Sequence, residues 1–360
     1  MCIRDSHYSH QATTGLGMLG DGKGRGIQLH NCLMYNCGDK QIQGAAGALL
    51  HYRKFKPENE TKMQRLARSR ESTIWGDLVD QVGAAPQGSR WIHVWDRGGD
   101  NFEAICHVRL AGNDWVVRAA QLHRNVITDD RCTVQLSKAI DEAGLLGSYE
   151  LNLRSRPGVA ARTARLEVSV VSIGYPRPSQ YSKWVKESGV SELAMNVVIV
   201  QEVNAPPGAT AIRWVLLTSL AVETFKDAWQ VIEDYENRWQ VEEYHKVLKT
   251  GCSLEVHALR DTARLEPLIA LVSVIGVRLF LLKLIGRNQP EAKASRHVPA
   301  SWLRCLKLAQ PKVRLTGMSV YEYFREVAKL GGFLGCKHDG EPGWQRFGAG
   351  TKKSNRCLTV

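Results

Sequence analysis

The sequence predicts an α/β protein with a β-rich central segment and a helical, basic C-terminal region. Three observations lead to this prediction. A strand, a helix and a second strand are expected within residues 91–118, short β-rich runs separated by Pro and Gly clusters occupy 149–212, and residues 224–250 keep helical periodicity without Pro or Gly. A chain of 360 residues with 44% hydrophobic content is enough for one large domain or two modest ones, each with its own core.

The first part of the chain predicts a strand and a surface helix. Residues 26–35 alternate apolar and polar side chains after a glycine-rich stretch, which is typical of a strand that leaves a turn. That stretch, residues 15–25, is not a phosphate loop, because Gly24 follows Lys23 where the loop pattern needs Ser or Thr. Residues 62–82 place apolar side chains at helical spacing among charges, which predicts a surface helix.

The strands and helices that follow along the chain carry or flank the candidate functional residues. A strand is expected over 91–95, a helix over 101–110 and a second strand over 114–118. The apolar run 213–217 predicts another strand directly before the long helix over 224–250, which is the clearest helix in the chain.

Composition excludes several classes of protein. The most apolar stretch, Leu265 to Ile285, contains Glu266, Arg278 and Lys283, so we expect a buried helix and no membrane span. The first residues lack the basic and apolar regions of a secretory signal, which predicts a cytoplasmic protein. Nine cysteines without a C-x-x-C pair fit a reducing compartment and do not indicate a zinc site.

The positive charge is concentrated near the C-terminus. The whole chain has a formal net charge of +12, and from Val277 onwards 16 Lys and Arg stand against 5 Asp and Glu, which gives +11 and leaves +1 for residues 1–276. A basic region of this kind indicates a polyanion partner, above all nucleic acid, and added solubility is the alternative explanation.

One face of the long helix carries a carboxylate among cations. Its members follow one another at intervals of three, four, four and three residues and are Tyr235, Arg238, Glu242, Lys246 and Lys249. Such a face suits phosphodiester chemistry, since the carboxylate can hold a divalent cation while Arg and Lys neutralise phosphates. The alternative is an exposed face with ordinary intrahelical ion pairs, such as Arg238 with Glu242.

Asp96 is the second candidate ligand, because it follows the strand over 91–95 directly. Two-metal hydrolysis of phosphodiesters uses carboxylates that come from elements distant in sequence, so Asp96 and Glu242 form a candidate pair. A helix cap formed by Asp96 or Asp100 is the alternative.

At this point the sequence resembles a known family. Residues 235–251, YENRWQVEEYHKVLKTG, are similar to the Y-R-E-K signature of the DDE transposases of the IS-four type, to which the Tn-five transposase belongs. Further similar segments lie in the same order as in the family, and these are residues 8–31, 93–100, 213–219 and 328–344. The resemblance therefore spans Tyr8 to Trp344.

The resemblance implies a ribonuclease-H-like fold, in which a mixed sheet is flanked by helices, a β-rich insertion precedes the catalytic helix and a helical region ends the chain. Four segments are expected: the first part of the core over 8–145, the insertion over 146–212, the second part of the core over 213–262, and a basic helical region for dimerisation and DNA contact over 263–360.

The resemblance also implies roles for single residues. Asp96 and Glu242 would be the second and third acids of the triad and would bind Mg²⁺ or Mn²⁺. The residues that would contact DNA phosphates near the cleaved end are Tyr235, Arg238, Lys246 and Lys249. Trp214 would stack on a flipped base of the transposon end and Arg118 would hold the distorted strand. Core packing is the alternative for Trp214.

The function implied is that of a DNA transposase, which moves an insertion sequence by metal-dependent strand cleavage and strand transfer. Its partners would be double-stranded DNA at the terminal repeats and the target, and a second copy in the synaptic complex, in a bacterial cytoplasm at the nucleoid. Counting back from Tyr8 to the family's first acid reaches Cys2, with Asp5 out of register. We therefore expect a chain truncated at both ends with little or no catalysis. A catalytically inert DNA-binding or inhibitor derivative is the alternative, and a stand-alone nuclease of the same fold is a third.

Overall fold

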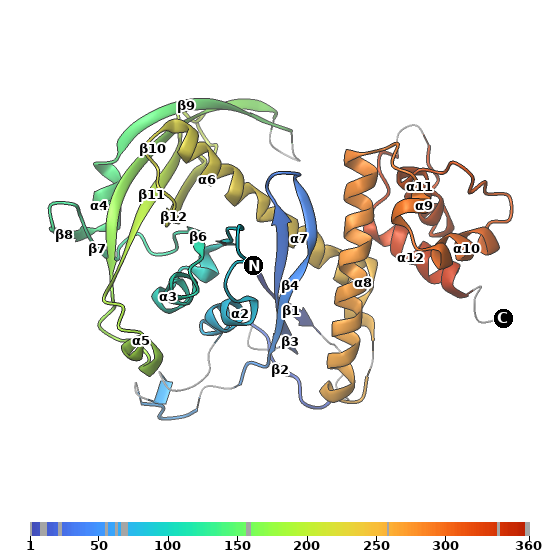
Figure 1. Ribbon diagram of the computed structural model, residues 1–360, viewed down its shortest axis with the longest axis horizontal. Coiled ribbons are helices and arrows are strands. Elements are labelled where there is room, and N and C mark those ends of the chain that lie inside the picture. The colour runs from blue at the N-terminus through green and yellow to red at the C-terminus, as the bar shows by residue number, and fades with distance from the viewer. Residues whose placement is uncertain are drawn as a thin grey trace. The chain divides into compact units, whose positions relative to one another are not determined.

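The computed structural model describes residues 2–7, 13–20, 24–54, 57–61, 64–65, 71–155, 160–257, 259–336 and 339–356. It is a mixed α/β structure with an eight-stranded mixed sheet flanked by helices (Figure 1). Contacts divide the chain into two compact units. The first, which we name the sheet unit, is Met1–Cys2 with Phe55–Arg238, and the second, the helix unit, is Ile3–Lys54 with Trp239–Val360.

The sheet unit contains the eight-stranded sheet in the order β5-β6-β12-β11-β10-β7-β8, with β9 also paired to β10. Its strands are β5 (Ile92–Trp95), β6 (Asp114–Arg118), β7 (Asn125–Ile127), β8 (Thr133–Gln135), β9 (Gly144–Leu153), β10 (Arg162–Pro176), β11 (Glu192–Val203) and β12 (Arg213–Thr218). The pair β5 and β6 is parallel, because α3 crosses between them, and the other pairs are antiparallel.

The helices of the sheet unit are α2 (Ile74–Val82), a short 3₁₀ helix (Arg97–Gly99), α3 (Phe102–Leu110), α4 (Leu136–Asp141), α5 (Lys183–Glu187) and α6 (Phe225–Asn237). Thr224 and Asp227 form a capping box that starts α6, since each side chain accepts the other's backbone N–H. Val231 and Ile232 of α6 then pack against buried valines and leucines of the sheet. This core fixes α6 over the strands that carry the candidate site.

The helix unit contains a four-stranded sheet and the C-terminal helices. Its strands are β1 (Cys2–His7), β2 (Gly17–Met18), β3 (Arg25–Asn36) and β4 (Gln41–His51), with β3 paired to the other three. Its helical elements are α7 (Trp239–Lys246), a π-helical turn (Val247–Gly251), a 3₁₀ turn (Leu254–Val256), α8 (Thr262–Asn288), α9 (Ala294–His297), α10 (Ala300–Ala309), α11 (Val320–Leu330) and α12 (Trp344–Arg356).

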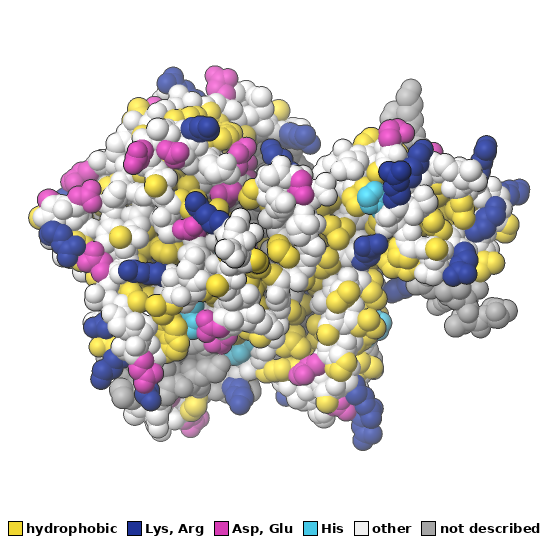
Figure 2. All heavy atoms as spheres, viewed as in Figure 1, with side chains coloured by type: hydrophobic (Ala, Val, Ile, Leu, Met, Phe, Trp, Pro, Cys, Tyr) yellow, Lys and Arg dark blue, Asp and Glu magenta, His cyan; other side chains and the backbone are white. Residues whose placement is uncertain are grey.

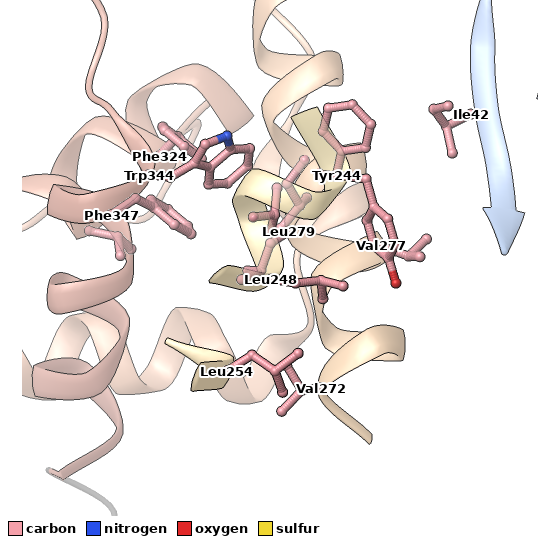
Figure 3. Packing of buried hydrophobic residues seen from close by; sticks show 14 of the residues in the cluster. Ile42, Tyr244, Leu248, Leu254, Val272, Val277, Leu279, Phe324, Trp344 and Phe347 are labelled. Atoms are coloured by element: carbon pink, nitrogen blue, oxygen red, sulfur yellow. The ribbon is translucent and has the colours of Figure 1, made fainter. Parts of the chain in front are cut away.

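An aromatic cluster holds α12 in the helix unit. Trp344 is only 2% exposed and meets Phe324 of α11 edge-on, while Phe324 and Phe347 stack with ring centroids 3.9 Å apart (Figure 3). Two glycines of α12 permit the close approach, because a Cβ added to Gly348 or Gly350 would lie 2.0 Å or 1.8 Å from a backbone carbonyl oxygen of a neighbouring element. The helix unit therefore depends on small residues as well as on aromatic packing.

Helix α8 covers the stretch expected as a buried helix over 265–285 and is buried in part. Among the described residues it is the helix long and apolar enough to cross a membrane, judged by length and composition, and 44% of its most apolar window is buried. It packs against α7, α11 and β4. One side of α8 is therefore buried in the helix unit, while Leu271 and Val274 of the same helix are exposed.

Most elements expected from the sequence are present. The strands over 26–35, 91–95, 114–118 and 213–217 and the helix over 101–110 are confirmed within one or two residues. Of the surface helix expected over 62–82, α2 covers Ile74–Val82, and residues 62–63 and 66–70 lie outside the described residues. The long helix is confirmed with a one-residue interruption at Arg238, which keeps helical φ and ψ of −53° and −30°.

Candidate functional site

The strand register brings three of the predicted residues to one edge of the eight-stranded sheet. β5 and β6 are parallel with Trp95 opposite Val117, so Asp96 and Arg118 follow at the same level. β12 is antiparallel to β6 with Leu216 opposite Arg118, so Trp214 lies two residues further toward this edge. The arrangement exists because parallel strands end at a common edge and the antiparallel neighbour begins there.

Asp96 caps a short 3₁₀ helix with one carboxylate oxygen and faces Arg238 with the other. Its Oδ1 accepts the backbone N–H of Gly98 at 2.8 Å and so caps the 3₁₀ helix Arg97–Gly99. Its Oδ2 lies 3.9 Å from Nη1 of Arg238 at the end of α6, and the Asp96 side chain is 36% exposed. The cap uses one carboxylate oxygen, and the other faces a guanidinium.

Helix α3 is capped by neither of the aspartates that were considered. Asn101 performs that role, because its Oδ1 accepts the backbone N–H of Ala104 at 2.8 Å. Asp100 is instead buried, where Oδ2 accepts the N–H of Ala120 at 2.5 Å and pairs with Arg124. Asp100 therefore links the segment after β5, which also contains Asp96, to the loop after β6.

An aromatic row, formed by Tyr235 and Trp214, extends the site from Arg238. The Arg238 guanidinium lies 5.8 Å from the ring centroid of Tyr235, one helical turn earlier on α6. Tyr235 is 6% exposed and meets Trp214 edge-on, with ring centroids 5.6 Å apart and planes at 63°. Trp214 is half-buried, so core packing against Tyr235 accounts for part of its ring and leaves part accessible.

Arg118 is held beside Trp214. Its Nη2 donates to the carbonyl oxygen of Arg213 at 3.3 Å, across the pair of β6 and β12. Arg97 and Arg213 are exposed at the same edge. The edge thus presents several guanidinium groups around one accessible carboxylate, an arrangement that attracts anions.

The remaining predicted residues belong to the helix unit. Glu242 is half-buried in the first turn of α7. Lys246 pairs with Glu243 at 3.7 Å, and Lys249 of the π-helical turn pairs with Glu255 at 2.9 Å. The helix face predicted from spacing is therefore shared between the two units, with Tyr235 and Arg238 in the sheet unit and the other three in the helix unit.

No group of three or more His, Cys, Asp or Glu side chains within the described part of the chain could hold a metal ion. Strand β1 begins at Cys2, the position that the resemblance aligns with the family's first acid. The side chains of Cys2 and Asp5 lie outside the described residues. No known protein-family model matches the chain.

The role of Asp100 was missed by the sequence reasoning, which treated it only as a cap. The segment HVWDRGGD contains both aspartates, and nothing in the spacing indicates which of them faces solvent. Pairing with Arg124, which comes from the loop after β6, decides this, because burial of a carboxylate requires a partner of opposite charge.

Proposed function

We propose that the protein is a DNA transposase of the DDE type, similar to the IS-four family, which cleaves and rejoins DNA strands at the ends of a mobile element. The observation that carries the proposal is the contact row Asp96, Arg238, Tyr235 and Trp214. These residues lie in β12 and α6 or directly after β5 and α6, and the family resemblance implies an acid or DNA-binding role for each. A purely structural helix face does not require this combination.

The ribonuclease-H-like fold is part of the same proposal. It is supported by the parallel unit of β5, α3 and β6, by the antiparallel β12 beside β6, and by α6 packed on these strands. The β-rich segment expected as an insertion contributes β9, β10 and β11 to the same sheet.

The residues suit strand-transfer chemistry on a phosphodiester. Asp96 and Glu242 supply carboxylate oxygens, the ligand type that Mg²⁺ and Mn²⁺ take, and the family resemblance implies that they would be metal ligands. When bound, such a metal activates water or a 3′-hydroxyl and neutralises charge on the phosphate. Arg118 and Arg238 would bind phosphates of the cleaved end, and Trp214 offers its accessible ring to an unpaired base.

The position of Cys2 favours a second candidate function, an inert DNA-binding or inhibitor derivative of a transposase. A thiol stands where the family has its first aspartate. Thiolates are soft ligands that Mg²⁺ does not select, so the metal would lose one oxygen ligand. The Arg and Trp residues that would bind DNA do not depend on Cys2.

The two candidates are separated by a cleavage assay on plasmid DNA that carries the genomic sequence flanking the reading frame. We expect little nicking by the wild type in Mg²⁺ or Mn²⁺, and metal-dependent nicked and joined products from Cys2→Asp. Asp96→Asn and Glu242→Gln in the Cys2→Asp chain should abolish both products, and Asp129→Asn, an exposed aspartate elsewhere on the sheet unit, should not.

Each result has a distinct meaning. Metal-dependent cleavage by the wild type would exclude the inert derivative, and products that are cut but never joined would indicate a stand-alone nuclease. A salt-dependent gel shift without cleavage by either chain would favour the inert derivative. Absence of both cleavage and DNA binding would contradict both candidates.

A further inference from the structure

A half-buried lysine of α8 lies over the central tryptophan of the helix unit. The Nζ of Lys283 is 4.3 Å from the ring centroid of Trp344. The indole packs against Phe324 and Phe347 (Figure 3) and against Phe280. Its Nε1 lies 3.4 Å from a carboxylate oxygen of Glu243. The Lys283 ammonium therefore lies over a ring that the surrounding aromatic side chains hold in place.

Two further cations act on the same place. Arg287 follows Lys283 by one turn of α8, and Lys246 is the last residue of α7. Burial has the largest effect on the pKa of Lys283, and Arg287 and Lys246 lower it further through their positive charge. With Glu243 and Glu341 opposing, the pKa falls to about 8. The positive charges of Lys283, Arg287 and Lys246 thus repel one another, and the Lys283 ammonium is also partly desolvated.

The negative charges of Glu243 and Glu341 oppose the lowering of the Lys283 pKa, but both carboxylates also have other partners. Glu243 pairs with Lys246, and Glu341 accepts from the Tyr321 hydroxyl at 3.0 Å and lies 3.9 Å from Arg325. Throughout the described residues, neither Lys283 nor Arg287 has an Asp or Glu oxygen within ion-pair distance of 4.0 Å. Both cations therefore lack an ion-pair partner among the described residues and can pair with an anion from outside the chain.

We infer that Lys283 and Arg287, beside Lys246, bind a backbone phosphate of DNA. A phosphate carries the charge and the several acceptor oxygens that an ammonium and a guanidinium from adjacent turns can share. The C-terminal region around it has a net charge of +11 from Val277 onwards, and Figure 2 shows Lys and Arg side chains over the C-terminal helices with few acidic ones among them. An extended polyanion fits this surface better than an isolated small anion.

That the phosphate belongs to DNA rests on the proposed function. The binding of a phosphate by Lys283 and Arg287 does not rest on it. Lys283 and Arg287 are outside the Y-R-E-K signature and outside the residues assigned above. Their position on α8 would extend the phosphate contact expected for Lys246 onto a second helix.

The first test measures the affinity of the full-length chain for a short DNA duplex over a range of salt concentrations. Lys283→Met keeps the apolar contact with Trp344 and removes the charge, and Arg287→Gln removes the second charge. Each should weaken binding and lower the salt slope by about one, as loss of one phosphate contact does. Arg296→Gln, an exposed charge on α9, removes the same formal charge and should change the slope less.

Equal effects of Lys283→Met and Arg296→Gln would overturn the inference and leave the proposed function standing. The second test follows the Lys283 pKa by NMR of ¹³C-methylated lysines, assigned by comparison with Lys283→Met. Inorganic phosphate should raise this pKa, because the anion stabilises the ammonium, and no rise would overturn the site. A rise together with no DNA binding by the wild type would refute DNA as the ligand and the proposed function with it.

Discussion

Arg238 and Asp96 connect the end of α6 to the end of the parallel strand β5. Their guanidinium and carboxylate groups lie 3.9 Å apart, and the Arg238 side chain is 14% exposed. The same guanidinium lies over Tyr235. One arginine thus orders a carboxylate proposed as a metal ligand and an aromatic row proposed to meet DNA.

Two substitutions separate the effect of the Arg238 charge on DNA binding from the effect of its planar guanidinium. Arg238→Gln should weaken DNA binding and reduce its salt slope by about one, because a cation near the phosphates is lost. Arg238→Lys should keep the slope but still weaken binding, since an ammonium lacks the planar fork that reaches Asp96 and covers Tyr235. Fluorescence anisotropy against salt concentration measures both quantities, and identical curves for the two variants would contradict the assignment.

Trp214 should contribute to binding of an unpaired base more than to binding of regular duplex. Trp214→Ala is expected to cost about 1–3 kcal/mol of affinity for a duplex with one unpaired terminal base, the usual range for aromatic stacking on a base. Trp214→Phe should retain most of that affinity. The comparison uses the same duplex with and without the unpaired base, and an equal loss on both would show that Trp214 acts only through packing against Tyr235.

Breaking the buried pair behind Asp96 should destabilise the sheet unit. Asp100→Asn leaves the Arg124 guanidinium buried without its counter-charge, so the free energy of unfolding should fall by about 3–5 kcal/mol. Arg124→Met combined with Asp100→Asn should recover part of this loss, because no unpaired charge then remains. Urea unfolding of the wild type and the two variants measures the effect, and a double variant less stable than Asp100→Asn would argue against it.

Gly350 should be intolerant of any side chain. A Cβ there would lie 1.8 Å from the carbonyl oxygen of Val327, so Gly350→Ala must move α12 away from α11. Such overpacking costs about 1–3 kcal/mol or more. Gly343→Ala is the matched control, since nothing lies within 4 Å of its Cβ. Thermal unfolding should show a lower midpoint for Gly350→Ala alone, and equal midpoints would mean that α12 adapts without cost.

The lowered pKa of Lys283 predicts that the free energy of unfolding rises with pH. Its pKa is lowered from an ordinary 10.5 to about 8, first by burial and then by Arg287 and Lys246, with Glu243 and Glu341 opposing. Below pH 8 the ammonium is charged in both states and its burial disfavours folding. Between about pH 8 and 10.5 the unfolded chain binds more protons, so the free energy of unfolding increases with pH and then levels off.

Urea unfolding at several pH values, with Lys283→Met as reference, isolates this contribution. The difference in unfolding free energy between the wild type and the variant should change in favour of the wild type across that interval. A difference that stays constant with pH would show that the Lys283 pKa is not lowered by folding.

Local elements were predictable because their causes are local. Periodicity identified β5, α3, β6 and the helix that continues from α6 into α7, and the absence of Pro and Gly set the extent of that helix. The candidate residues Asp96, Arg238 and Glu242 were also found from spacing and strand ends. The π-helical turn at Val247–Gly251 was not, because its backbone geometry depends on packing against α8 and α12.

By itself the sequence determined the α/β class, the positions of the main strands and helices, and the residue types available for phosphodiester chemistry. Tertiary structure alone decided which aspartate is buried with Arg124 and which faces Arg238, that Trp214 meets Tyr235, and that Lys283 lies over Trp344. The physical reason is that periodicity and capping depend on neighbours along the chain. Burial and charge pairing depend instead on which distant segments the core brings together.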